Sequence, residues 1–131
     1  MAIKHHLSET DATITSILSG TVTYSGLMTC FQIVDKYLTD TQFPMVFWVI
    51  DAKNIQMSYG DMIQVIEATS DNLSGTGGDP RVIPLLVVDD YVYEYLRSEM
   101  ENRYNWTQFP NFESVDEAIS FIQYINYLQQ G

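Results

Sequence analysis

The apolar residues of this chain change their spacing several times, and each spacing predicts a type of secondary structure. Residues 45–50 form an unbroken apolar run, which is typical of a strand buried on both faces. From Tyr24 to Thr39 the apolar residues recur every three or four positions, which predicts a helix with one buried face. The same patterns predict strands at 2–7, 12–18, 82–88 and 104–109, and helices at 58–73, 90–102 and from 114 onward.

The order of these elements, ββαβαβαβα, predicts the fold class. Strands that alternate with helices pair in parallel through right-handed crossovers. We therefore expect one α/β domain over residues 1–131, with a mostly parallel sheet and with strands 45–50 and 82–88 adjacent at its centre. Pro84 interrupts the second of these strands. Because proline has no N–H to donate, this strand starts late or has an edge there.

An acidic residue and a helix start follow the first buried run. Asp51 ends the run, Ser58 stands where an N-cap is expected, and Asp61 lies three residues further on. In open α/β sheets, sites form beyond the carboxyl ends of the strands. The candidate binding or switch residues are therefore Asp51, Ser58, Tyr59 and Gly60, together with Asp89 and Asp90 after the later strand.

Charge and composition exclude several classes of function. The net charge is −11, from 6 basic and 17 acidic residues, which repels nucleic acids and anionic lipid surfaces. Cys30 is the single cysteine, so an internal disulfide and a multi-cysteine metal site are excluded. The N-terminus has no apolar signal core, and no run approaches the length of a membrane span. We expect a cytoplasmic protein that does not insert into membranes.

The residues that most often perform catalysis form no recognisable set. His5 and His6 are adjacent in a predicted strand, so they point to opposite faces and do not chelate one metal ion together. The glycine-rich segment 75–78 follows a helix and lacks the lysine of a phosphate loop, so we interpret it as a flexible connector. Asp89 and Asp90 suit a helix start, where acidic side chains satisfy free amides. We expect no catalytic residue, no metal and no cofactor.

Four short segments stand in a characteristic order along the chain. They are Gly20-Thr21-Val22-Thr23, Val49-Ile50-Asp51 followed by Ser58-Tyr59-Gly60, Val87-Val88-Asp89-Asp90, and the stretch from Gln108 to Ile122. This order resembles the SpoIIAA-like branch of the STAS domains (sulfate transporter and anti-sigma-factor antagonist). The resemblance covers nearly the whole chain. It implies a small αβ sandwich whose helices lie mainly on one face of the sheet.

The resemblance also implies a way of acting. Many members of that family dock onto a protein partner, and some are switched by phosphorylation of a serine at the start of the second helix. Ser58 matches this serine, although the sequence here is Met57-Ser58-Tyr59-Gly60 where the antagonists carry Asp-Ser-Ser-Gly. We therefore expect a non-enzymatic regulatory or protein-binding domain, and a homodimer stays open.

Two alternatives remain beside this interpretation. One is a carrier of a small apolar ligand, held in a pocket between the sheet and the helices. The other is a small enzyme that uses strand-end carboxylates such as Asp51. A pocket lined by Phe, Trp and Met would favour the carrier, whereas an exposed helix start with an aromatic rim would favour docking.

Overall fold

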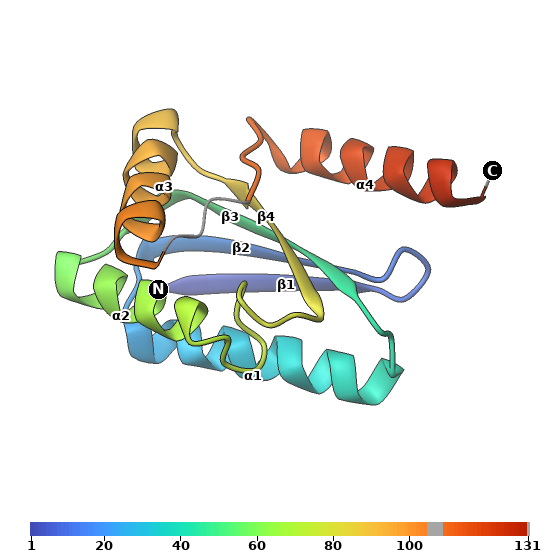
Figure 1. The fold of residues 1–131 in the computed structure, drawn as a ribbon, viewed down its shortest axis with the longest axis horizontal. Helices are drawn as coiled ribbons and strands as arrows, with labels where there is room; N and C mark the ends of the chain where they lie inside the picture. Colours follow the sequence, from blue (N-terminus) through green and yellow to red (C-terminus); the bar gives the residue numbers. More distant parts are fainter. Residues whose placement is uncertain (105–108, 131) are drawn as a thin grey trace.

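The computed structural model describes residues 1–104 and 109–130 and shows an α/β domain built on a four-stranded sheet (Figure 1). The elements are β1 (Ala2–Ser8), β2 (Thr13–Thr21), α1 (Tyr24–Thr41), β3 (Val46–Gln56), α2 (Tyr59–Ser70), β4 (Val82–Val87), α3 (Asp90–Tyr104) and α4 (Val115–Gln130). Each predicted helix and each of the first four predicted strands is present, with ends that differ by a few residues.

The sheet has the strand order β1-β2-β3-β4 and is mixed. The N-terminal hairpin pairs β1 and β2 antiparallel, from Ala2 opposite Ser19 to Ser8 opposite Thr13. The pairs β2–β3 and β3–β4 are parallel. The expectation of a mostly parallel sheet is therefore corrected, because a short turn joins the first two strands and forces them to run in opposite directions.

The two long apolar runs are neighbours, but only one of them is central. β3 and β4 pair in parallel from Val46 opposite Val82 to Asp51 opposite Val87, as predicted. β4 is the outer strand of the described sheet, so its predicted central position is wrong. β4 is apolar on both faces because helices cover both of them, although only one of its edges pairs with another strand of the described sheet.

The outer edge of β4 is partly satisfied by the chain that follows α3. The amide of Leu86 donates to the carbonyl of Pro110 at 3.1 Å, and the amide of Phe112 donates to the carbonyl of Leu86 at 2.8 Å. Pro84 lies two residues before Leu86, so its nitrogen also points outward, where no ladder donor is required. The sequence-based expectation of an edge at Pro84 is confirmed.

The strand predicted at 104–109 is wrong at both of its ends. Tyr104 is the last residue of α3, and Phe109 belongs to no strand. The residues between them, 105–108, lie outside the described residues. A single parallel bridge between Leu86 and Asn111 stands close to the predicted strand. The element order over the described residues is therefore ββαβαβαα.

Asp51 does not end its strand. β3 continues to Gln56, because residues 54–56 pair with residues 19–21 of β2 after the β3–β4 pairing has stopped at Asp51. A register shift between Ile17 and Ser19 of β2 marks the point where β3 separates from β4. Asp51 therefore stands at the end of the parallel β3–β4 ladder and in the interior of the strand.

Two apolar layers cover the two faces of the sheet (Figure 1). On one face α1 packs over β2 and β3, with Ile14, Phe31 and Trp48 in a common core. On the other face α4 packs over β3 and β4, and its Ala118 and Ile122 contact a layer that includes Val49. α2 and α3 share a third cluster with Phe109. α1, α2 and α3 pack on one side of the sheet, and α4 packs on the other side.

The glycine-rich connector before β4 is anchored rather than loose. The side chains of Thr76 and Asp79 are buried, and the carboxylate of Asp79 accepts hydrogen bonds from the amide of Gly75 and from the guanidinium of Arg81. Arg81 also binds Asp35 on α1 at 3.1 Å. The expectation of a flexible connector is therefore corrected, because this network fastens the segment to α1.

Candidate functional site

The start of α2 is built as the sequence predicts. Ser58 is the N-cap, and its hydroxyl oxygen accepts from the amide of Asp61 at 3.1 Å. The same hydroxyl donates to the carboxylate of Asp61 at 2.7 Å. The other carboxylate oxygen of Asp61 accepts from the amide of Tyr24 at 3.2 Å. Asp61 therefore links the amino ends of α1 and α2 through one side chain.

The residues after Ser58 face solvent. Tyr59 is 60% exposed, and its ring meets that of Tyr95 on α3 with the centroids 6.4 Å apart. Gly60 is exposed, and a side chain added there would meet nothing within 4 Å. Ser58, Tyr59 and Gly60 therefore form one exposed group, which offers a surface rather than a pocket.

Asp51 lies apart from that group. Side chains alternate along a strand, so Asp51 shares a face with Val49, whose neighbours include Ala118 of α4. Its carboxylate accepts from the amide of Lys53 at 3.2 Å. Among the described residues, no hydrogen bond or ion pair joins Asp51 to Ser58 or to Asp89. The carboxylate pairing required by the enzyme alternative therefore gains no support here.

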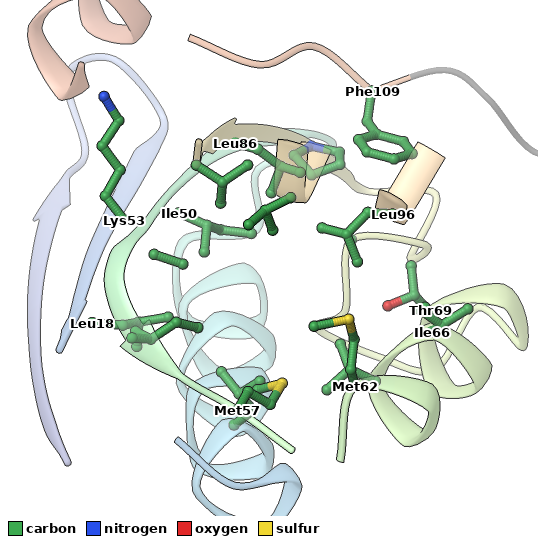
Figure 2. Close-up of a pocket in the computed structure, with 18 of the residues that line it drawn as sticks. Leu18, Ile50, Lys53, Met57, Met62, Ile66, Thr69, Leu86, Leu96 and Phe109 are labelled. Atoms are coloured by element: carbon green, nitrogen blue, oxygen red, sulfur yellow. The ribbon is translucent and has the colours of Figure 1, made fainter. Parts of the chain in front are cut away.

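A cavity of about 500 Å³ lies between the sheet and the helices α1, α2 and α3 (Figure 2). Trp48, Ile50 and Leu86 form its floor on the sheet. The helices contribute apolar walls, and Phe109 closes one side. The helical and loop lining consists of Leu27, Phe31, Met57, Met62, Val65, Ile66, Thr69, Val92, Leu96 and Met100, among others. The lining is therefore rich in the flexible and aromatic side chains that adapt to apolar ligands.

The polar residues of this cavity gather at its rim. Of the described lining residues, four are exposed to solvent, namely Lys53, Gln56, Asp89 and Tyr91, and we call them the rim. Among the other described lining residues, the polar groups are the hydroxyl of Thr69 and the indole N–H of Trp48, which donates to Ser16. The described interior is thus apolar, and the charged side chains of the lining lie where the cavity meets water.

Asp89 and Asp90 occupy the start of α3, where the sequence placed them. Both are exposed, and the carbonyl of Asp89 accepts the amide of Tyr93 in the first turn of the helix. Asp89 lines the cavity, whereas Asp90 does not. Of the six candidate residues, Asp89 is the one that the structure assigns to the cavity.

The described residues contain no candidate metal site and no candidate membrane-spanning helix. Within residues 1–104 and 109–130, no three His, Cys, Asp or Glu side chains are grouped as metal ligands would be. None of the helices described here combines the length and the apolar character that a bilayer crossing requires.

Comparison with solved structures identifies the fold. An uncharacterized protein of the DUF3478 family from Shewanella loihica PV-4, whose crystal structure has a SpoIIAA-like fold, aligns with this chain at a TM-score of 0.60. The alignment covers 92% of each chain. The chain has a SpoIIAA-like fold. The sequence identity is 13%, so this likeness concerns the fold alone. No family model matches the sequence, and no curated protein matches it either.

The sequence resemblance to SpoIIAA-like domains is thus confirmed for the fold. The pocket between sheet and helices that the carrier alternative requires is present, and its lining includes Phe, Trp and Met side chains. The sequence alone does not predict which residues line it. One signal is present in the sequence: Met57, Met62 and Met100 line the cavity from the loop before α2, from α2 and from α3. Methionine is common where a core has to adapt to a variable shape.

Proposed function

We propose that this chain is a non-enzymatic binding domain that holds a small apolar molecule in the cavity between its sheet and helices. The SpoIIAA-like fold is of a regulatory or binding type, and the cavity supplies the more specific observation. Its volume of about 500 Å³ falls within the range of small-molecule sites in proteins. This observation carries the proposal.

The lining supports binding rather than chemistry. General acid–base catalysis needs a titratable group within hydrogen-bond reach of the reacting atom. Among the described lining residues, the titratable side chains of Lys53, Asp89 and Tyr91 lie at the rim, away from the apolar interior. A ligand inside would gain affinity from buried apolar area and from contacts with Trp48 and Phe109.

A filling substitution tests this function. Ala52 lines the cavity on β3, and Ala52→Phe adds a ring that would occupy the space for a ligand. We expect the wild type to bind the uncharged dye Nile red, with a rise in fluorescence, and Ala52→Phe to lose that binding while it stays folded by circular dichroism. Ala2→Phe, at an exposed position of β1, is the matched control and should bind like the wild type.

Native mass spectrometry of freshly purified protein complements the dye. A retained small molecule in the wild type that is missing from Ala52→Phe would support the proposal and would give the ligand's mass. Failure of the wild type to bind Nile red, or equal binding by Ala52→Phe, would contradict a role for this cavity. The same spectrum reports whether the chain forms a dimer.

A second candidate function is favoured by the start of α2. The Ser58 hydroxyl is exposed and donates to Asp61, which in turn holds the amide of Tyr24. A phosphate on Ser58 would place about −2 charges against the Asp61 carboxylate. This repulsion would act on the link between α1 and α2. We propose on this ground that a protein partner docks beside Tyr59 and is released by such a change.

Capture of partners by three variants tests the second function. Wild type, Ser58→Asn and Ser58→Asp would each be immobilised, because Asn and Asp are both good N-caps and differ in charge. Loss of one partner by Ser58→Asp alone, in protein that circular dichroism shows to be folded at the assay temperature, would support a charge switch. Equal recovery by all three would leave Ser58 as a cap only. This chain has a net charge of −11, so the partner should be a protein with a basic surface and should not be a nucleic acid.

A further inference from the structure

We infer that the cavity prefers an amphiphile with a cationic head group, such as a long-chain amine, whose apolar tail lies inside and whose ammonium group meets Asp89 at the rim. This inference rests on the proposed apolar-ligand function and adds the charge of the ligand to it. It follows from the charged groups at the rim, from the ring of Tyr91 and from the charge of the whole chain.

The two charged rim residues differ in what already occupies them. The ammonium group of Lys53 donates to the main-chain carbonyl of Glu113, in the segment that leads into α4. Figure 2 shows the Lys53 side chain extending away from the labelled residues of the cavity interior. An anionic head group would have to compete with that carbonyl for the ammonium group, so Lys53 is a poor receptor for a carboxylate.

The Asp89 carboxylate is available to a ligand. Asp89 is exposed and lines the cavity, and no ion pair engages it within the described part of the chain. It can therefore accept hydrogen bonds from an ammonium head group without giving up an ionic partner. A charge-assisted bond of this kind is stronger than one between neutral groups.

The neighbouring rim residue suits the same head group. Tyr91 lies two positions after Asp89, lines the cavity and is 76% exposed. The face of an aromatic ring attracts a cation through its quadrupole, whereas it does not attract an anion. Asp89 and Tyr91 thus offer two independent attractions to one positive charge.

The field of the whole molecule acts in the same direction. With 17 acidic and 6 basic residues, the chain lowers the free energy of an approaching cation and raises that of an anion. Salt screens this contribution between exposed groups. None of the described residues of the apolar interior has a charged side chain, so the charged end of an amphiphile stays at the rim and only its tail enters.

Three ligands of equal chain length test the inference. Decylamine, decanoate and decanol would each displace Nile red from the wild type near neutral pH, where the amine is cationic and the acid is anionic. We expect decylamine to bind at least about threefold more tightly than decanol, as is reasonable for an exposed ionic contact, and decanoate to bind most weakly. Added salt should reduce the difference between the amine and the acid.

Two neighbouring substitutions separate the contact from the general field. Asp89→Asn and Asp90→Asn remove the same charge from adjacent exposed positions, but only Asp89 lines the cavity. We expect Asp89→Asn to lose the preference for the amine over decanol and Asp90→Asn to keep most of it. Decanol should bind both variants as it binds the wild type, which shows that the cavity is intact.

The outcomes distinguish the two levels of the proposal. Equal displacement by all three ligands, or tighter binding of decanoate, would overturn the cationic preference and leave apolar binding in place. An equal loss in Asp89→Asn and Asp90→Asn would also overturn the rim contact. If none of the three ligands displaces Nile red, or if the dye does not bind, the cavity function fails as well.

Discussion

The indole N–H of Trp48 donates to the hydroxyl oxygen of Ser16 at 2.9 Å, in the buried layer between the sheet and α1. The Nδ1 atom of His5 lies 2.8 Å from the same hydroxyl. An indole nitrogen can only donate, so Ser16 accepts from Trp48, and its own proton remains free to be donated to His5. Three strands are thus joined by one serine, and Trp48 also forms part of the cavity floor.

Removal of that serine hydroxyl should destabilise the fold. Ser16→Ala leaves the buried indole N–H without its acceptor, so we expect the free energy of unfolding to fall by about 1–3 kcal/mol. Urea denaturation, followed by tryptophan fluorescence, gives the value. Ser120→Ala, at an exposed position of α4, should change stability by less than about 0.5 kcal/mol. A similar small effect for Ser16→Ala would show that the hydrogen bond contributes little.

The histidine of this group gives the protein a pH dependence. Burial lowers the pKa of His5 from its ordinary value of 6.5. The unfolded chain therefore binds a proton more readily than the folded chain. The partly buried, neutral imidazole is compatible with the fold above about pH 6.5, and the protein loses stability as the pH falls below that value. We expect melting temperatures at mildly acidic pH to drop less for His5→Gln than for the wild type. His6→Gln, on the exposed side of β1, is the control, and an identical pH profile for all three proteins would contradict the assignment.

The cap of α2 can be resolved into two contributions. Ser58→Ala removes the acceptor for the Asp61 amide and should cost about 0.5–2 kcal/mol. Ser58→Asn restores a cap, whereas Ser58→Asp restores a cap but adds a second carboxylate beside that of Asp61. We therefore expect chemical denaturation to rank Ser58→Asp below Ser58→Asn, with a difference that shrinks in salt. Equal stability of these two variants would mean that Asp61 moves away freely.

Asp79 should make the protein sensitive to strong acid. Burial raises the pKa of this carboxyl group, but hydrogen bonds from Arg81 and from the amide of Gly75 outweigh that effect and lower the pKa to about 2. The unfolded chain has the higher pKa, so the stabilisation is present above about pH 4 and is lost as the pH falls toward 2. Asp79→Asn should unfold more easily at neutral pH, by about 2 kcal/mol, and the difference from wild type should disappear in acid. A constant difference across that range would contradict this view.

Two glycines should differ in their response to the same substitution. Gly75 has a φ of +79°, and an added Cβ would lie 2.0 Å from the carbonyl oxygen of Phe31, so Gly75→Ala should cost at least about 1 kcal/mol. Gly60 has open space around it in the first turn of α2, so Gly60→Ala should be neutral or stabilise by up to about 1 kcal/mol. Thermal denaturation of the two variants decides. A tolerated Gly75→Ala would mean that the connector is not held against α1.

Local signals in the sequence account for most of the fold. The N-cap at Ser58, the edge at Pro84 and the helical face of α1 each depend on a few neighbouring residues, and each prediction is confirmed. The positions of whole strands depend on distant partners. The run 82–88 has the apolar character of a central strand, yet it forms an edge strand. α4 covers one of its faces, and α2 and α3 cover the other. A one-dimensional pattern does not distinguish these two ways of burying a strand.

The candidate site was predictable only in part, for a related reason. Met62, Val65, Ile66 and Thr69 are spaced as one face of the helix predicted at 58–73, and all four line the cavity. The sequence specifies that this face is apolar. The sequence does not specify whether side chains of α3 and the sheet fill the space next to this face of α2. That depends on the distances between α2, α3 and the sheet in the folded chain. The sequence predicts Asp89 at a helix start and as a candidate binding residue, but its place at the cavity rim depends on how α3 packs against the sheet.

The edges of the sheet have unequal consequences for contact between molecules. At β4, Pro84 offers no N–H outward, and the main chain at Pro110 and Phe112 already satisfies both polar groups of Leu86. A strand from another molecule therefore finds few free groups there. β1 forms the other edge of the described sheet, with Lys4 and His6 along it. Edge-to-edge growth into aggregates is thus restricted to one side of the domain, where lysine is the residue that most often discourages it.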